Sequence, residues 1–239
     1  MTQSEAHPTA SFPDEEAVSG RLNALRAGVL GANDGIVSIA ALLVGVVAAT
    51  DDAGVILTTA LAGIAAGALS MGVGEYVSVS SQRDAEKAQL EREKMWHDHR
   101  PEWELDQLAR LHMETGMSEA TARAAAIEQT AFDPLAAHAR AHLGIDPEEL
   151  VNPWHAAFAS LGAFTLGGIF PLLTAVLAPD AFKVPLTFAV VIVALAVSGT
   201  VSARLGHAPR LRAIVRNVLG GSLAMAITYG IGTFAGTAL

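Results

Sequence analysis

The sequence predicts an all-α, multi-pass membrane protein with five transmembrane helices and a polar helical insert between the second and the third. The 239-residue chain is 51% hydrophobic and only 16% charged, with a mean hydropathy of +0.40, whereas a soluble domain is about 25% charged. The charge is also concentrated, because 15 of the 24 acidic residues lie between residues 82 and 152. No stretch shows the alternating pattern of a β-strand.

Five apolar stretches are long enough to cross a bilayer. A transmembrane helix needs about 20 mostly apolar residues, and backbone groups in lipid must be satisfied internally, which favours helices. Within these stretches, Asp34 and Glu75 are the acidic side chains, and none is basic. The predicted spans are residues 27–50, 53–81, 156–179, 184–203 and 217–239.

The distribution of basic residues predicts the orientation. Fourteen of the 15 Lys and Arg residues fall on one side of the predicted membrane, and Lys183 falls on the other. The positive-inside rule then places the N-terminus and the insert in the cytoplasm and the C-terminus outside. The polar, acidic start lacks the pattern of a signal peptide. The predicted organisation is a disordered tail (1–20), helices one and two (21–81), the cytoplasmic insert (82–152) and helices three to five (153–239).

Composition and motifs exclude several functions. The chain has no cysteine, which excludes disulfide scaffolds and thiolate metal centres. Its net charge of −9 offers no basic surface for nucleic acid. The sequence contains no glycine-rich phosphate loop and no hydrolase motif. We therefore expect neither an enzyme nor a nucleic-acid-binding protein.

Three intramembrane residues are candidates for a transport pathway. A carboxylate such as Asp34 costs roughly 2.5–3.5 kcal/mol inside a bilayer and usually serves ions or protons there. The alternative is an aspartate that only caps a kink beside Gly35. Met71 and Glu75 are four residues apart and share a helix face. A thioether with a carboxylate suits Fe²⁺ better than Ca²⁺ or Mg²⁺, although methionine alone is more often core filler.

The insert reads as a series of helices. The second span is expected to continue unbroken to His97. One further helix begins at Pro101, a second follows Ser118 as its N-cap, and a third opens with Asp133 as its N-cap and ends at Gly144.

The insert also carries candidate metal ligands. It contains 5 of the 8 histidines, and two pairs, Glu93 with His97 and His138 with His142, have the spacing of one helix face. Imidazole with carboxylate suits Fe²⁺ or Mn²⁺. The alternative is an ordinary solvated face, because basic residues interleave with the glutamates. The candidate ligands are Glu86, Glu93, His97, Glu102, Glu104, His138 and His142.

Three segments resemble the vacuolar iron transporter (VIT/CCC1) family. They are RAGVLGANDGIVSIAALLVGV (26–46), ALSMGVGEYVSVSSQRDAE (68–86) and HLGIDPEELVNPWHAAFASLGAFTLGGIFPLL (142–173). The resemblance covers nearly the whole chain after residue 20, and its NDGIVS and SMxxGEYVSVSSQ motifs are specific. The chain resembles a prokaryotic-type member without a ferritin-like domain.

The resemblance implies a homodimer that exports Fe²⁺, Mn²⁺ or both from the cytosol by proton antiport, with no tightly bound cofactor. Asp34 and Met71 match residues that line the family's dimer-interface pathway, and Glu75 matches the glutamate of its GEY motif. His138 and His142 stand where plant members carry a methionine and a glutamate. The glutamates that match the family's metal-collecting residues are Glu86, Glu93, Glu102 and Glu104.

Two other classes of function remain open. The first is a membrane-anchored sensor or storage module for divalent metal, in which the spans only anchor the insert. Buried charge at Asp34 and Glu75 argues against it, since an anchor needs none. The second is an intramembrane enzyme that uses these two carboxylates as acid and base, which no nucleophile motif supports. The favoured expectation is a metal transporter of a prokaryotic plasma membrane.

Overall fold

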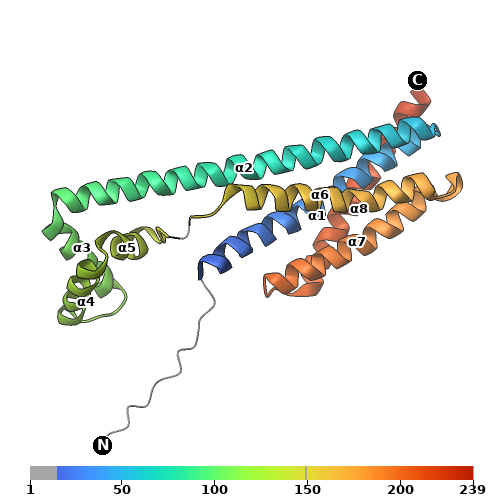
Figure 1. Ribbon diagram of the computed structural model, residues 1–239. Helices are drawn as coiled ribbons and strands as arrows, with labels where there is room; N and C mark the ends of the chain where they lie inside the picture. The colour runs from blue at the N-terminus through green and yellow to red at the C-terminus, as the bar shows by residue number, and fades with distance from the viewer. Residues whose placement is uncertain (1–14, 149, 239) are drawn as a thin grey trace, which may run out of the picture. The chain divides into compact units, whose positions relative to one another are not determined.

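A computed structural model describes residues 15–148 and 150–238 of the chain. It divides into two compact units, one formed by Asn23–Ser78 with Pro153–Leu239 and one containing Val79–Asn152. All regular secondary structure in the described residues is helical, which confirms the predicted all-α class (Figure 1).

Five helices are long and apolar enough to cross a membrane, as the sequence predicts. The second is a single helix of 47 residues, so the predicted continuation beyond the second span is confirmed. The first begins at Glu15, inside the segment 1–20 that the sequence assigns to a tail, while residues 1–14 lie outside the described part. The five helices are α1 (Glu15–Ala49), α2 (Ala53–His99), α6 (Pro153–Leu177), α7 (Lys183–Leu205) and α8 (Arg210–Ala238).

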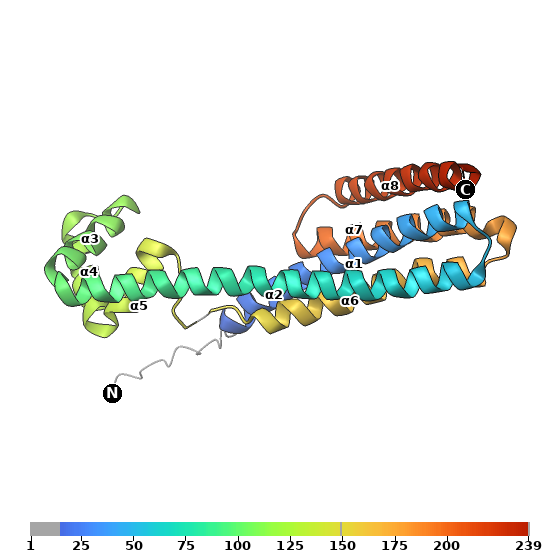
Figure 2. The same cartoon turned by 90° about the horizontal axis from the view of Figure 1, so that it is seen from above.

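Close contacts at glycines bring the membrane helices together. A methyl group at Gly35 of α1 would overlap the backbone of Phe164 in α6, and one at Gly232 of α8 would overlap the carbonyl oxygen of Gly45 in α1. Only glycine allows backbones to approach this closely. In both views α1 runs alongside α6 (Figures 1 and 2), and the buried Phe164 ring joins Ile39 in the core between these helices.

The insert contains three short α-helices followed by one π-helical turn. The side chains of Ser118 and Asp133 accept hydrogen bonds from the backbone N–H groups of Thr121 and Ala136, which confirms both predicted N-caps. The last helix ends at Gly144, with φ +64°, as predicted, although its final turn is π-helical instead of α-helical. The bounds are α3 (Pro101–Glu114), α4 (Glu119–Phe132), α5 (Pro134–His138) and the π turn Ala139–Leu143.

Candidate metal sites

Three helices bring one histidine and two glutamates together inside the insert. The Nδ1 atom of His138 in α5 lies 3.0 Å from Oε1 of Glu93 in α2 and 3.2 Å from Oε2 of Glu104 in α3. One potential ligand atom from each residue lies within 4.8 Å of the others. The three residues are at most 1% exposed. We call this group of three residues the insert centre.

Two further histidines flank the insert centre. The His97 ring lies one helical turn beyond Glu93, with its centroid 5.7 Å from that of His138. The Nδ1 atom of His142 lies 3.6 Å from Oε1 of Glu93, and its side chain is 32% exposed. Three buried polar atoms here have no hydrogen-bond partner: Nε2 of His97, Nε2 of His138 and Oε1 of Glu104. Such orphaned atoms are costly unless a ligand completes them.

The protonation equilibria of the insert centre follow from its burial. Burial raises the pKa of Glu104, and the nearby charge of Glu93 raises it further. Burial lowers the pKa of His138, which keeps its imidazole neutral and able to ligate a metal at neutral pH. Two carboxylates with a neutral imidazole leave negative charge in a buried space, and a divalent cation would neutralise it. Oxygen and nitrogen donors together suit Fe²⁺ and Mn²⁺.

Two predicted ligands do not join the insert centre. The Glu86 carboxylate accepts a hydrogen bond of 2.8 Å from Nε2 of Gln82, and Glu102 is exposed. Of the four candidate glutamates in the insert, Glu93 and Glu104 are the ones that turn inward.

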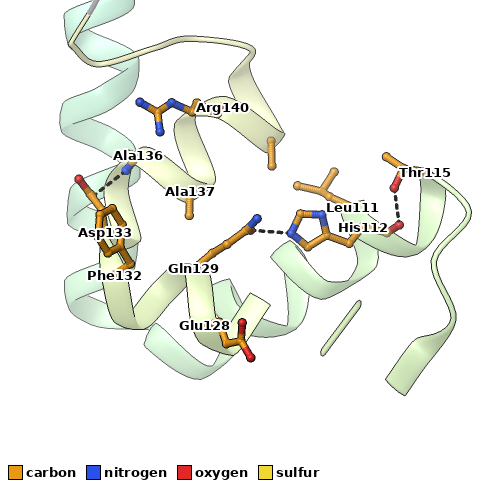
Figure 3. A pocket seen from close by; sticks show the side chains of 11 residues that line it. Leu111, His112, Thr115, Glu128, Gln129, Phe132, Asp133, Ala136, Ala137 and Arg140 are labelled. Atoms are coloured by element: carbon orange, nitrogen blue, oxygen red, sulfur yellow. Dashed lines mark hydrogen bonds between the residues drawn. The ribbon is translucent and has the colours of Figure 1, made fainter. Parts of the chain in front are cut away.

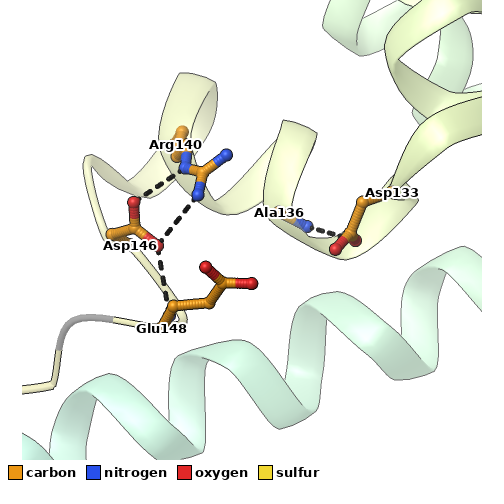
Figure 4. Close-up of polar contacts among 5 residues, drawn as sticks. All are labelled: Asp133, Ala136, Arg140, Asp146 and Glu148. Atoms are coloured by element: carbon orange, nitrogen blue, oxygen red, sulfur yellow. Dashed lines mark hydrogen bonds and ion pairs between the residues drawn. The ribbon is translucent and has the colours of Figure 1, made fainter. Parts of the chain in front are cut away.

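An ion pair holds the π turn that follows His138. The guanidinium of Arg140 donates hydrogen bonds of 2.9 and 3.1 Å to the two carboxylate oxygens of Asp146, which also accepts from the backbone N–H of Glu148 (Figure 4). The hydrogen bonds from Arg140 lower the pKa of Asp146. These contacts tie the turn to the chain after Gly144 and so restrain the segment that carries His138.

A pocket of about 670 Å³ in the insert is lined by potential metal ligands that do not lie close together. The Nε2 atom of His112 lies 2.7 Å from Oε1 of Gln129, and Phe132 and Ala137 contribute apolar walls (Figure 3). Of the two acidic residues on its wall, Asp133 already caps α5. Among the described residues, no group of three potential ligands forms here.

The compact unit formed by Asn23–Ser78 and Pro153–Leu239 contains a second candidate site. This site is a pocket of about 320 Å³ between α1, α2 and α8. Asp34 and Met71 both line it. Oδ1 of Asp34 accepts a hydrogen bond of 2.7 Å from Ser38, and Oδ1 of Asn33 is buried without a hydrogen-bond partner. We call this cavity the membrane pocket. Its lining residues are Leu30, Asn33, Asp34, Val37, Met71, Arg216, Asn217, Gly220 and Gly221.

Glu75 lies outside the residues that line the membrane pocket. Its side chain is 10% exposed, and its Oε2 atom lies 3.8 Å from a terminal nitrogen of Arg26. Asn33, Arg216 and Asn217 do line the pocket, although no sequence pattern singles them out as site residues. Two are neutral amides, and membrane orientation already explains the charge of Arg216.

The fold and these two sites define a multi-pass membrane protein with candidate cation ligands both among its membrane-spanning helices and in its insert. The chain belongs to the VIT family, whose model matches residues 25–233. The resemblance carried by the NDGIVS and GEYVSVSSQ motifs is thereby confirmed.

Similarity to individual proteins extends over most of the chain. It is 41% identical over 227 residues to a vacuolar iron transporter of Acanthamoeba castellanii, which covers 95% of this chain and 84% of the relative. It is 37% identical over 230 residues to vacuolar iron transporter homolog 5 of Oryza sativa, covering 96% of this chain and 88% of the relative. It is 36% identical over 220 residues to vacuolar iron transporter homolog 4 of Arabidopsis thaliana, covering 92% of this chain and 87% of the relative.

Proposed function

We propose that this protein transports Fe²⁺, Mn²⁺ or both out of the cytosol in exchange for protons. The observation that carries the proposal is the membrane pocket, where a carboxylate and a thioether from different helices line one cavity. The names of the relatives, which are vacuolar iron transporters or homologues of them, support metal as the cargo.

The donors of the membrane pocket suit a borderline divalent cation. Ser38 occupies one oxygen of Asp34, which leaves the other oxygen available. Met71 supplies a soft sulfur donor, and Asn33 supplies a buried amide oxygen without a hydrogen-bond partner. Ca²⁺ and Mg²⁺ favour oxygen ligands alone, whereas mixed sulfur and oxygen donors favour Fe²⁺.

The carboxylate of Asp34 would also exchange the cation for a proton. A carboxylate inside the membrane is costly while it is charged and unpaired, so Asp34 would bind a proton when the cation leaves. Glu75 is the other intramembrane carboxylate and could pass the proton on. In the homodimer that the family resemblance implies, two copies of Asp34 near the axis would repel each other and favour this exchange.

The insert centre would collect the cation in the cytosol. The positive-inside rule favours a cytoplasmic insert and an outer C-terminus, and the sequence favours a prokaryotic plasma membrane. Glu93, Glu104 and His138 provide two carboxylates and an imidazole in one buried group. The same group also supports the second candidate, a membrane-anchored sensor or storage module that binds metal without transporting it.

Flux in proteoliposomes tests the proposal. Mn²⁺ or reduced Fe²⁺ is added outside vesicles that contain a metal-sensitive dye and a pH probe. Wild type is compared with Asp34→Asn, which can still accept the hydrogen bond from Ser38, and with Asp51→Asn, an exposed control in the link between α1 and α2. We expect metal entry with a rise in internal pH, abolished by Asp34→Asn and kept by Asp51→Asn.

Two results would contradict the proposal. Full transport by Asp34→Asn would remove the carboxylate from the pathway. No flux in the wild type, together with saturable metal binding that is lost in Glu104→Gln, would assign the protein to the sensor or storage class.

A further inference from the structure

The α8 side of the membrane pocket carries a charge that the proposed transport chemistry does not use. Arg216 lines the pocket together with Asp34 and Met71, and it is the one basic side chain among the lining residues. Asp34 is the one acidic side chain among them. A pocket proposed to hold a divalent cation therefore has a permanent positive charge on its wall, because arginine stays protonated in proteins.

Arg216 has no carboxylate partner among the described residues. No carboxylate oxygen in this part of the chain lies within 4.0 Å of its guanidinium, whereas Arg26 pairs with Glu75 at 3.8 Å and Arg140 pairs with Asp146 at 2.9 Å. The carboxylate of Asp34 likewise has a hydrogen bond from Ser38 but no basic partner within the described ranges. The pocket thus contains one acid and one base that are not paired with other charges.

The charge balance of the pocket changes when a cation enters. After Asp34 has released its proton and before a cation binds, the charges of Asp34 and Arg216 balance. When a divalent cation binds beside Asp34, the guanidinium of Arg216 faces a like charge and is repelled by it. Arg216 is exposed and Asp34 is half-buried, so solvent screens this interaction in part, and it is weaker than one between two buried charges. The long arginine side chain can follow this change by moving toward or away from Asp34.

We propose that Arg216 is a positioning residue of the transport cycle. It acts as the counterion of ionised Asp34 in the interval between proton release and cation binding, and it is displaced when the divalent cation binds. Competition between the guanidinium and the cation weakens cation retention and favours release. This inference rests on the proposed transport function and deepens it, since it names a residue that sets how long the pocket stays occupied.

Three variants test the role of Arg216. Arg216→Gln removes the charge, and Arg216→Lys keeps it. Arg212→Gln removes a charge four residues earlier on α8, from an arginine that is exposed like Arg216 but does not line the pocket. Because both Gln variants lose one basic residue on the same side, they affect membrane orientation equally. Initial rates of Mn²⁺ uptake into proteoliposomes give KM and kcat for each protein.

We expect Arg216→Gln to lower both KM and kcat for Mn²⁺, each by about tenfold, because a retained cation binds more tightly and leaves more slowly. Arg216→Lys should restore both constants toward the wild type, and Arg212→Gln should leave them unchanged. A merely structural arginine would lower kcat without tightening KM. If Arg216→Gln does not fold, Arg216→Met, which keeps an apolar stem without charge, gives the same comparison.

The outcomes separate a failure of this role from a failure of transport. Unchanged constants in Arg216→Gln, or equal changes in Arg216→Lys and Arg216→Gln, would overturn the role of Arg216 while wild-type flux still supports transport. Absence of flux in the wild type would reject the transport function itself and the role of Arg216 with it.

Discussion

The Nδ1 atom of His138 lies 3.0 Å from Oε1 of Glu93, a carboxylate 45 residues earlier in the chain. Both side chains are almost completely buried. A neutral imidazole can donate a hydrogen bond to a carboxylate but cannot cancel its charge. With Glu104 beside them, the insert centre therefore holds negative charge that is costly to bury without a cation.

Metal is expected to stabilise the insert. At a hundredfold excess over its Kd, a metal that binds the folded state alone adds about 2.7 kcal/mol to the free energy of unfolding. Thermal unfolding of the full chain in detergent, with and without Mn²⁺, measures this change. Glu93→Gln should reduce the shift, and an equal shift in both proteins would contradict a role for this carboxylate.

Two glutamates of α3 should differ in their effect on metal binding. Glu104 is buried in the insert centre, whereas Glu102 is exposed. We expect Glu104→Gln to weaken metal binding at least tenfold, because loss of even a supporting ligand partner typically costs about 10–100-fold. The absorption bands of Co²⁺, titrated into the full chain, measure the affinity. Glu102→Gln is the control and should stay within about twofold of the wild type.

Metal binding to the insert centre should weaken as the pH falls from about 7 to about 5, because protons compete for its ligands. The raised pKa of Glu104 means that its carboxylate takes up a proton at a higher pH than an ordinary glutamate. In the metal-free protein, ionised Glu104 lowers stability above its raised pKa, and this cost disappears as the pH falls through that pKa.

The lowered pKa of His138 delays the competition between protons and metal at its imidazole to a lower pH. Its imidazole stays neutral to a lower pH than an ordinary histidine, so we expect Glu104 to dominate the first loss of binding. Co²⁺ titrations at several pH values measure the profile. Glu104→Gln should flatten it, and a profile of unchanged steepness would assign the proton competition to another group.

Filling the membrane pocket should block transport without disturbing the fold. Gly220 lines the pocket, and a methyl group there would meet no other atom within 4 Å. We expect Gly220→Leu to fold normally and to lose at least tenfold in Mn²⁺ flux, because the side chain occupies the cavity. Gly230→Leu on the same helix has equally open space but does not line the pocket, so its flux should match the wild type.

The close contact between α1 and α8 should tolerate no side chain at Gly232. A methyl group there would overlap the carbonyl oxygen of Gly45, whereas one at Gly230 would meet no other atom within 4 Å. Overpacking typically costs about 1–3 kcal/mol, so we expect Gly232→Ala to lower the thermal stability in detergent. Gly230→Ala should leave it unchanged or raise it slightly, and equal stability of the two variants would contradict this packing.

The sequence determined the helices and their class. An apolar run of membrane-spanning length has few alternatives to a helix, since lipid offers its backbone no hydrogen bonds. The N-caps Ser118 and Asp133 and the stop at Gly144 were also predictable, because each acts on its own neighbouring residues. The start of α1 at Glu15 was not predicted, and neither was the π turn after α5.

Only the tertiary structure decided which candidate residues meet. Helical spacing places Glu93 near His97 along one helix, but it does not bring Glu93 to Glu104 and His138, which come from other helices. It equally could not separate buried Glu104 from exposed Glu102, two residues apart on α3, or place Arg216 in the pocket of Asp34. Local patterns report contacts within one helix, whereas these contacts depend on how separate helices pack.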